Sequence, residues 1–143
     1  MNQRRVFTFG YAGAPFRAFL HIVDQLDATV LDCRFSPRSR IPTWSGVNLR
    51  RALGDCYVWA QPWGNPGYKG TEAALADADA GLAIFDALDS PTVIVMCACK
   101  NPQTCHRALV RDLLLRERGI VATELDVLDE PEARQLTIFS KGE

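Results

Sequence analysis

Long apolar runs and a large excess of charge of either sign are both missing from this sequence of 143 residues. A transmembrane helix needs roughly 20 consecutive apolar residues, whereas the longest apolar runs here have only the length of a strand. The 16 basic and 17 acidic residues give a formal net charge of −1, so the chain has no overall attraction to nucleic acids or membrane surfaces. We therefore expect no membrane partner, and any affinity for an anion must be local.

An even number of cysteines is missing, since the chain has five, and residues 1–5 lead into a strand pattern instead of the apolar core of a signal peptide. We therefore expect reduced thiols in a cytoplasmic protein. Internal repeats, low-complexity segments and any signal for an oligomeric state are also missing. The 48% of hydrophobic residues suffices for one domain spanning residues 1–143, with no element assigned after about residue 128.

Short apolar runs alternate with helical periodicities along the chain. Proline and arginine mark residues 34–44 as a basic loop, and glycine and proline mark residues 61–70 as a second loop. The alternation predicts an α/β fold, a three-layer sandwich with a mainly parallel central sheet of about five strands, Rossmann-like or flavodoxin-like. We predict strands at 5–9, 29–33, 56–60, 92–97 and 120–125, and helices at 14–26 (Pro15 in its first turn), 46–53, 71–88 (Thr71 as N-cap) and 104–118.

Reactive side chains concentrate in residues 93–107, where a predicted strand passes into a predicted helix. Gly10 and Tyr11 follow the first strand, and Asp32 and Arg34 end the second. In an open α/β sheet the carboxyl ends of the strands lie at one edge, and ligands bind there. The sequence therefore predicts a site at this edge.

Strand alternation places Asp32 and Arg34 on one face of the sheet and Cys33 on the other. Asp32 and Arg34 are expected to form an ion pair that also meets a ligand, and the alternative is a purely structural pair. In the helix 104–118, His106 lies near the middle of the apolar face and Arg107 near its edge. His106 is therefore aimed over the sheet, within reach of Cys97, either as a functional group or as a packed core histidine.

The start of the helix 104–118 is also expected to attract anions, because its free N–H groups and dipole favour phosphate or carboxylate. Arginines in and near the basic loop can add charge and two-pronged contacts. The alternative for the loop is a solvated surface. The basic residues in question are Arg34, Arg38, Arg40, Lys100 and Arg107.

The thiols permit three interpretations. Cys97 or Cys105 at a helix start can act as a nucleophile with His106 as its base. Zinc ligation by Cys97, Cys99, Cys105 and His106 is less favoured, because the Cys-x-Cys spacing is unusual and His106 points away from Cys105. Buried structural cysteines are the third interpretation. Residues 10–13 are not a Gly-x-Gly-x-x-Gly fingerprint, and we expect neither a cofactor nor a metal.

Seven short motifs spread over most of the chain together resemble the family called domain of unknown function 488. The resemblance implies a compact three-layer α/β domain, found mainly in prokaryotes, whose shared residues gather at one end of the sheet; it implies no particular activity. The matching motifs are Phe9-Gly10-Tyr11, Asp32-Cys33-Arg34, Ser36-Pro37-Arg38-Ser39-Arg40, Gly64-Asn65-Pro66, Met96-Cys97-Ala98, Lys100-Asn101-Pro102 and Cys105-His106-Arg107.

Carried over by position, the resemblance marks Gly10, Tyr11, Asp32, Arg34, Pro37, Arg38, Cys97, Cys105, His106 and Arg107 as family-typical. The chain departs from the family at Cys33, where an aliphatic residue is usual, and at Cys99, where glutamate is more common. The departure at Cys99 weakens the zinc interpretation.

Our leading hypothesis is a domain that binds a phosphate-bearing small molecule, such as a nucleotide, or a nucleic-acid end at the carboxyl edge of its sheet. Arg34, Arg38 and Arg107 hold the anion, while Gly10, Tyr11 and Cys105 line the pocket. Asp32 orients an arginine or a ligand hydroxyl, and catalysis, where present, uses Cys97 and His106 with Asp32. In this hypothesis Cys97, Cys105, His106 and Arg107 form one wall, opposite Asp32, Arg34 and Arg38. The alternatives are a thiol-dependent enzyme or redox protein and a non-catalytic interaction module.

Overall fold

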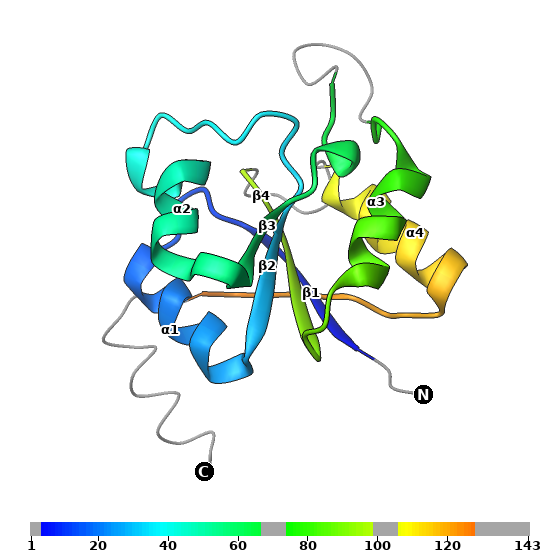
Figure 1. The fold of residues 1–143 in the computed structure, drawn as a ribbon, viewed down its shortest axis with the longest axis horizontal. Helices are drawn as coiled ribbons and strands as arrows, with labels where there is room; N and C mark the ends of the chain where they lie inside the picture. Colours follow the sequence, from blue (N-terminus) through cyan, green and yellow to red (C-terminus); the bar gives the residue numbers. More distant parts are fainter. Residues whose placement is uncertain (1–3, 67–73, 99–105, 128–143) are drawn as a thin grey trace.

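The computed structural model describes residues 4–66, 74–98 and 106–127. Strands and helices alternate along this part of the chain (Figure 1). The elements are β1 (Arg5–Gly10), α1 (Phe16–Leu26), β2 (Ala28–Asp32), α2 (Gly46–Leu53), β3 (Tyr57–Trp59), α3 (Ala78–Ala87), β4 (Thr92–Cys97), α4 (Arg107–Arg118) and β5 (Thr123–Glu124), with short 3₁₀ turns at Pro42–Trp44, Gly54–Cys56 and Gln61–Trp63.

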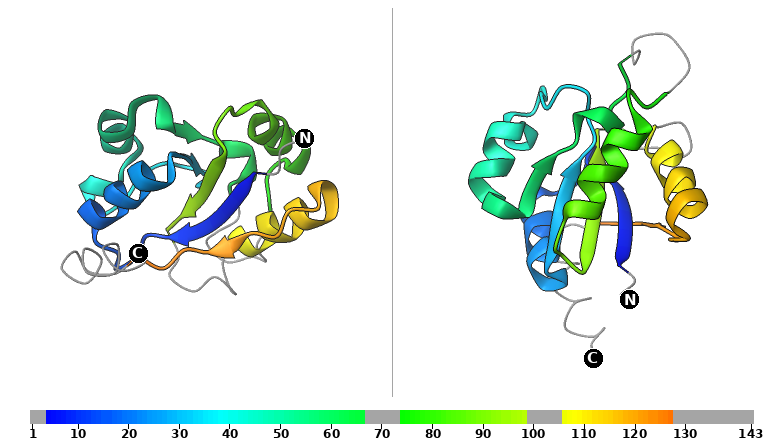
Figure 2. Two further views of the ribbon diagram at one scale, coloured as in Figure 1. Left: turned by 90° about the horizontal axis from the view of Figure 1, so that it is seen from below. Right: turned by 45° about the vertical axis from the view of Figure 1, so that its right-hand side comes forward.

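The five described strands form one sheet in the order β3-β2-β4-β1-β5, and each neighbouring pair is parallel. β4 lies at the centre, between β2 and β1, and all six of its residues are buried. Helices α1 and α2 cover one face of the sheet, and α3 and α4 cover the other (Figures 1 and 2). The predicted three-layer α/β sandwich with a parallel central sheet is confirmed.

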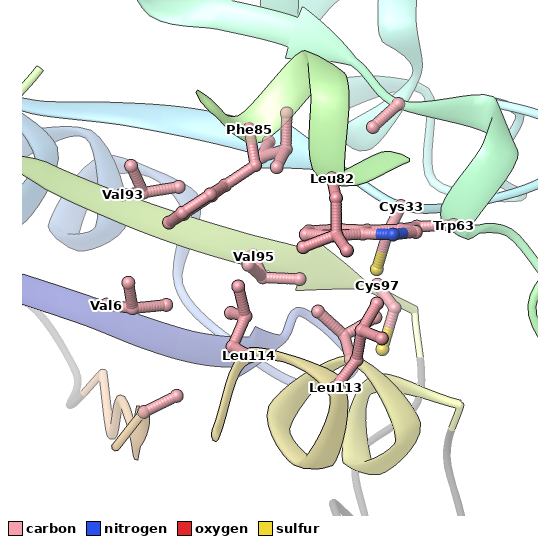
Figure 3. Close-up of a cluster of buried hydrophobic side chains, with 14 residues drawn as sticks. Val6, Cys33, Trp63, Leu82, Phe85, Val93, Val95, Cys97, Leu113 and Leu114 are labelled. Carbon is pink, nitrogen blue, oxygen red and sulfur yellow. The ribbon is translucent and has the colours of Figure 1, made fainter. Parts of the chain in front are cut away.

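Each face of the sheet carries its own hydrophobic core, because alternate strand residues point to opposite faces. The α1/α2 core includes Phe9, Val30, Ile94 and Met96, with Phe19 and Val23 from α1. The α3/α4 core includes Val6, Leu31, Val93 and Val95, with Leu82 and Phe85 from α3 and Leu113 and Leu114 from α4 (Figure 3). Cys33 and Cys97 belong to the α3/α4 core.

Two helix starts differ from the predicted ones. The predicted start of the helix 71–88 is wrong, because residues 74–77 are not helical and α3 begins at Ala78. The Asp77 side chain accepts a hydrogen bond from the Ala80 N–H at 3.1 Å and so caps α3, while Thr71 lies outside the described residues. Pro15 is the extended N-cap of α1 and not a residue of its first turn.

The chain leaves neighbouring strands of the sheet towards opposite faces. β1 and β2 lead to α1 and α2 on one face, whereas β4 leads to α4 on the other. Folds of this class bind ligands outside the carboxyl ends of the strands, at the point where the winding reverses. The carboxyl end of β4, between those of β1 and β2, is that point here. In the part of the chain that the structure describes, no helix is long and apolar enough to cross a membrane.

Candidate functional site

A buried ion pair occupies the carboxyl end of β2. Nε and Nη2 of Arg34 donate to Oδ1 and Oδ2 of Asp32 at 2.8 and 2.6 Å, and the Arg34 backbone N–H donates to Oδ1 at 3.2 Å. The Asp32 side chain is fully buried and the Arg34 side chain is 6% exposed. This pair confirms the prediction that the two side chains share one face and meet each other.

Two tyrosines complete what we call the Asp32 cluster: Asp32, Arg34, Tyr11 and Tyr57. The Tyr57 hydroxyl donates to Asp32 Oδ2 at 2.5 Å. Nη1 of Arg34 reaches the Tyr11 hydroxyl at 3.4 Å, and the guanidinium carbon lies 5.4 Å from the centre of the Tyr11 ring. Tyr11 in turn stacks on Trp44, with ring centres 4.9 Å apart. An aromatic wall therefore supports the guanidinium group of Arg34.

Charge and burial act together on the protonation of this cluster. Burial opposes the charge of Arg34, but the hydrogen bonds and attraction to Asp32 outweigh it and hold its pKa above the ordinary value. Burial raises the pKa of Tyr57, and the negative charge and hydrogen bond of Asp32 raise it further. The cluster therefore holds a permanent cation beside a neutral phenol.

The loop after β2 is held in place by a glycine at the start of α2. The Gly46 N–H donates to the Pro37 carbonyl at 2.8 Å, and a Cβ added to Gly46 would lie 2.8 Å from Cβ of Pro37. The close approach fixes the loop beside Arg38, whose carbonyl accepts from Nη1 of Arg34 at 3.4 Å. The Arg38 side chain is exposed, so its charge faces solvent beside the Asp32 cluster.

A second buried arginine lies on the other face of the sheet, in what we call the Arg107 cluster: Arg107, Cys97, Glu124 and Thr8. Nε and Nη2 of Arg107 donate to Oε1 and Oε2 of Glu124 at 3.1 and 2.9 Å, and Nη1 donates to Cys97 Sγ at 3.0 Å. The Thr8 hydroxyl donates to Glu124 Oε1 at 2.7 Å. The cluster therefore joins α4 to β4, β5 and β1.

Arg107 is buried, with 1% of its surface exposed, although the sequence placed it near the edge of the apolar face. Burial opposes its charge, but the Glu124 hydrogen bond and the attraction to Cys97 outweigh burial, so its pKa lies above the ordinary value. The guanidinium group and the sulfur atom are therefore in direct contact inside the protein.

His106 is the N-cap residue of α4 and does point over the sheet, as predicted. Its Nε2 lies 2.7 Å from the carbonyl oxygen of Cys33. The His106 side chain therefore connects the start of α4 to the end of β2. Because the carbonyl only accepts, this contact places the proton on Nε2. The predicted start of this helix at Thr104 lies outside the described residues.

The structure thus separates the predicted pocket into two groups. Asp32, Arg34 and Tyr11 lie with the α1/α2 core, whereas Cys97 and Arg107 lie with the α3/α4 core. Both groups lie at the carboxyl edge, and His106 at the start of α4 contacts the Cys33 carbonyl at the end of β2. Gly10 pairs with Cys97 across β1 and β4, while Cys99, Lys100 and Cys105 lie outside the described residues.

Three polar residues of the two clusters were not predicted from the sequence. Tyr57 lies in a strand that was predicted, but its contact with Asp32 depends on the pairing of β3 with β2. Thr8 and Glu124 meet only because β5 pairs with β1. A polar residue in an apolar strand pattern, such as Thr8, is the one local signal that was available.

Within residues 4–66, 74–98 and 106–127, no group of three or more histidine, cysteine, aspartate or glutamate side chains is arranged to hold a metal ion. The polar groups at this edge are instead cationic arginines, each fixed by one carboxylate. In each arginine the carboxylate takes the two-pronged Nε and Nη2 edge, which leaves Nη1 as the donor for other contacts.

The fold and these two clusters define an open, parallel α/β domain with buried charged groups at the carboxyl edge of its sheet. More specifically, the chain belongs to the family described as domain of unknown function DUF488, whose model matches residues 18–114. The match includes Asp32, Arg34, Cys97, His106 and Arg107. No curated protein and no solved structure matches the chain.

Proposed function

We propose that this protein binds a phosphate-bearing ligand, a nucleotide or a nucleic-acid end, at the carboxyl edge of its sheet. The observation that supports this proposal is the hydrogen bonding of the three guanidinium nitrogens of Arg34. Asp32 holds the Nε and Nη2 edge of the guanidinium group at 2.8 and 2.6 Å, whereas among the described residues Nη1 has only the two contacts of 3.4 Å to Tyr11 and Arg38. Phosphate oxygens accept strongly from such a donor.

Each predicted residue has a role in this proposal. Asp32 orients Arg34, and Tyr57 supports Asp32. Tyr11 lines the pocket, and the exposed Arg38 supplies a second cation from the loop. On the other side of β4, Gly10 and His106 lie at the same edge with Arg107 behind them, and Cys105 is proposed to contribute from the segment before α4.

Arg38 is the informative position for a test, because Arg34 and Arg107 are buried and paired. Removing one partner of a buried ion pair costs roughly 3–5 kcal/mol and would mix unfolding with loss of binding. Arg38→Ala removes an exposed charge, and Arg40→Ala is the matched control, since Arg40 is also exposed and lies two residues further along the same loop.

The measurement is calorimetric titration of the protein with inorganic phosphate, a nucleoside monophosphate and a 5′-phosphorylated oligonucleotide. Arg38→Ala is expected to weaken binding by about 10–140-fold, as loss of one charge-assisted hydrogen bond predicts, and Arg40→Ala by less than about threefold. Equal effects of the two substitutions would argue for a diffuse surface charge instead of this site. No binding of any of the three probes by the parent protein overturns the proposal.

A thiol-dependent reaction is the second candidate, and the contact between Arg107 Nη1 and Cys97 Sγ at 3.0 Å favours it. Here Cys97 is the nucleophile and His106 the base, while Asp32 stays bound to Arg34 and Tyr57 on the other face of the sheet. Alkylation of Cys97 with iodoacetamide, followed against pH by mass spectrometry, tests this function. The expected result is reaction well below pH 8, whereas a thiol that reacts only above about pH 8 behaves as an ordinary cysteine.

A further inference from the structure

The thiols of Cys33 and Cys97 end two neighbouring strands on the same face of the sheet. The paired residues of β2 and β4 finish at Asp32 and Met96, and the Cys33 N–H continues the ladder by donating to the Met96 carbonyl at 2.9 Å. One step further in the same register, Cys33 faces Cys97. Both side chains are fully buried in the α3/α4 core, and Figure 3 shows their sulfur atoms at the same end of it.

The spacing of the two residues suits a covalent link. Neighbouring strands lie about 4.8 Å apart, which falls within the range of about 4.4–6.8 Å between the Cα atoms of disulfide-linked cysteines. Both cysteines are free thiols in the structure. The two residues are therefore close enough to form a disulfide with a small movement of the strand ends.

The hydrogen bonds of the two sulfur atoms differ in direction. Cys97 Sγ accepts from Arg107, whose other nitrogens are held by Glu124. The Cys33 thiol donates to the Met96 carbonyl at 3.2 Å. A cationic donor faces the sulfur atom of Cys97, as it does at nucleophilic cysteines, whereas a carbonyl acceptor requires a protonated thiol at Cys33. This is the arrangement of an attacking and a resolving cysteine.

We propose that Cys33 and Cys97 are a redox-active dithiol that a hydroperoxide converts into a disulfide between the carboxyl ends of β2 and β4. The Cys97 thiolate attacks the hydroperoxide, an S–O bond forms, the O–O bond breaks, and the leaving oxygen takes a proton to become water or an alcohol. Cys33 then attacks the sulfenic sulfur, the S–S bond forms, the S–O bond breaks, and hydroxide leaves as water with the Cys33 proton. Two thiols are oxidised and one hydroperoxide is reduced.

This dithiol shares Arg107 with the proposed phosphate site, but Asp32, Arg34 and Arg38 take no part in it. It has a route to that site, however. The Cys33 carbonyl contacts His106 Nε2, so a shift of Cys33 towards Cys97 moves the acceptor of the His106 proton. Oxidation is therefore expected to alter the position of His106.

The test uses the full chain with Cys56, Cys99 and Cys105 replaced by serine, so that only Cys33 and Cys97 remain, and circular dichroism verifies that it folds. The protein is treated with hydrogen peroxide, unfolded in urea, alkylated and weighed by mass spectrometry. Both alkylation sites are expected to disappear together, with a mass loss of two hydrogens, and to return after reduction with dithiothreitol.

Two variants of this protein separate the roles of the groups. Cys33→Val keeps an apolar strand residue and leaves Cys97 without its resolving partner, so dimedone should trap a sulfenic acid at Cys97 and no intramolecular disulfide should form. Arg107→Gln keeps a hydrogen-bond donor beside Cys97 but removes the charge, and urea unfolding first verifies that this variant of a buried, paired residue still folds. Disulfide formation in the folded variant should then slow roughly tenfold.

Two results overturn the proposal: both thiols remain alkylated after peroxide treatment, or only disulfides between separate chains form. If the triple serine variant does not fold, tryptic mapping of the oxidised parent protein gives the same decision. Cleavage after Arg34 and Lys100 releases peptides 18–34 and 70–100, which carry Cys33 and the pair Cys97 and Cys99. Fragmentation must then place the link between Cys33 and Cys97, and a link from Cys33 to Cys99 contradicts the inference.

Discussion

In the part of the chain that the structure describes, both buried arginines are held by a carboxylate along one edge of the guanidinium group. Asp32 holds Arg34 and Glu124 holds Arg107, in each case through Nε and Nη2. The carboxylate compensates the charge in a poorly solvated place and fixes the direction of the remaining nitrogen, Nη1. In Arg34 that nitrogen meets Tyr11 and Arg38, and in Arg107 it meets Cys97. Each pair therefore aims one donor at the carboxyl edge.

Glu124→Gln should lower the stability of the protein, because it leaves the buried Arg107 without its counter-charge. Glu124 is 34% exposed, so water offsets part of the loss, and we expect about 1–3 kcal/mol. The matched control is Glu117→Gln, which breaks an exposed pair with Arg116 at 3.4 Å and should cost less than about 0.5 kcal/mol. Urea unfolding measures both, and equal losses would show that the Arg107 pair does not stabilise the fold.

The raised pKa of Tyr57 predicts that the stability of the protein depends on pH in the alkaline range. Burial and the charge of Asp32 raise its pKa above that of a free tyrosine, about 10. The folded protein therefore keeps the phenol proton to higher pH than the unfolded chain, so this contribution to stability is complete below about pH 10 and is lost as the pH rises through the raised pKa.

Urea unfolding at pH 8 and pH 11 tests this dependence. The parent protein should lose more stability between the two pH values than Tyr57→Phe does, because phenylalanine has no proton to retain. In addition, the rise in tyrosinate absorbance with pH should include a late step in the folded parent protein, and this step should be absent in Tyr57→Phe. The same pH dependence in the two proteins would contradict the assignment.

Whether a contact between two side chains could be predicted from the sequence depended on how far apart the two residues lie along the chain. Asp32 and Arg34 are two residues apart, so strand alternation alone placed them together. Tyr57 reaches Asp32 across 25 residues, and Glu124 reaches Arg107 across 17. Those contacts depend on the order of the strands in the sheet. The pattern of side chains within one strand does not reveal this order.

At the scale of elements, strong local patterns gave accurate bounds. The predicted strand 92–97 and helix 46–53 have the bounds of β4 and α2, because β4 is a continuous apolar run and α2 has a serine cap, Ser45. The predicted start of α3 was wrong because Leu75 continued the apolar period without being helical. Leu75 does pack against the α3/α4 core, but from the segment before the helix.

Gly81 in α3 gives a prediction at this scale. A Cβ at this position would overlap with the indole ring of Trp63, which is fully buried. Gly81→Ala would stabilise an isolated helix by about 1 kcal/mol, but here it should destabilise the protein by about 1–3 kcal/mol through overpacking. Trp63 donates to the Ala78 carbonyl at 3.1 Å, so its fluorescence should shift as well.

The matched control is Ala83→Gly, an exposed position in the same helix, which should cost about 1 kcal/mol from helix propensity alone. Both substitutions should therefore destabilise the protein, although Gly81→Ala raises the helix propensity of α3 and Ala83→Gly lowers it. Thermal unfolding measures both effects, and a gain in stability for Gly81→Ala would show that α3 does not pack closely on Trp63.

At the scale of the whole molecule, the strand order decides which side chains can meet. The predicted alternation of strands and helices gave the three layers, but it did not state that β4 lies between β2 and β1. That order places Cys33 beside Cys97 on neighbouring strands, and strand alternation keeps the Asp32 cluster and the Arg107 cluster on opposite faces of the sheet. It also makes β4 the element that the two hydrophobic cores share, with alternate residues in each.

The shared position of β4 predicts how the protein opens. β4 is paired with β1 over six residues and with β2 over five, and both of its faces are buried, so its amides cannot reach water until both cores separate. β5 is paired over only two residues at the edge of the sheet. Hydrogen exchange followed by mass spectrometry in low concentrations of urea should show the peptide around residues 92–97 exchanging only by global unfolding, with the full urea dependence of that process. Residues 123–124 should exchange earlier and with a weaker urea dependence. Equal protection of the two strands would mean that the α3/α4 core and the edge of the sheet open as one unit, and the Arg107 cluster, which ties β5 to β4 through α4, would be the structural reason.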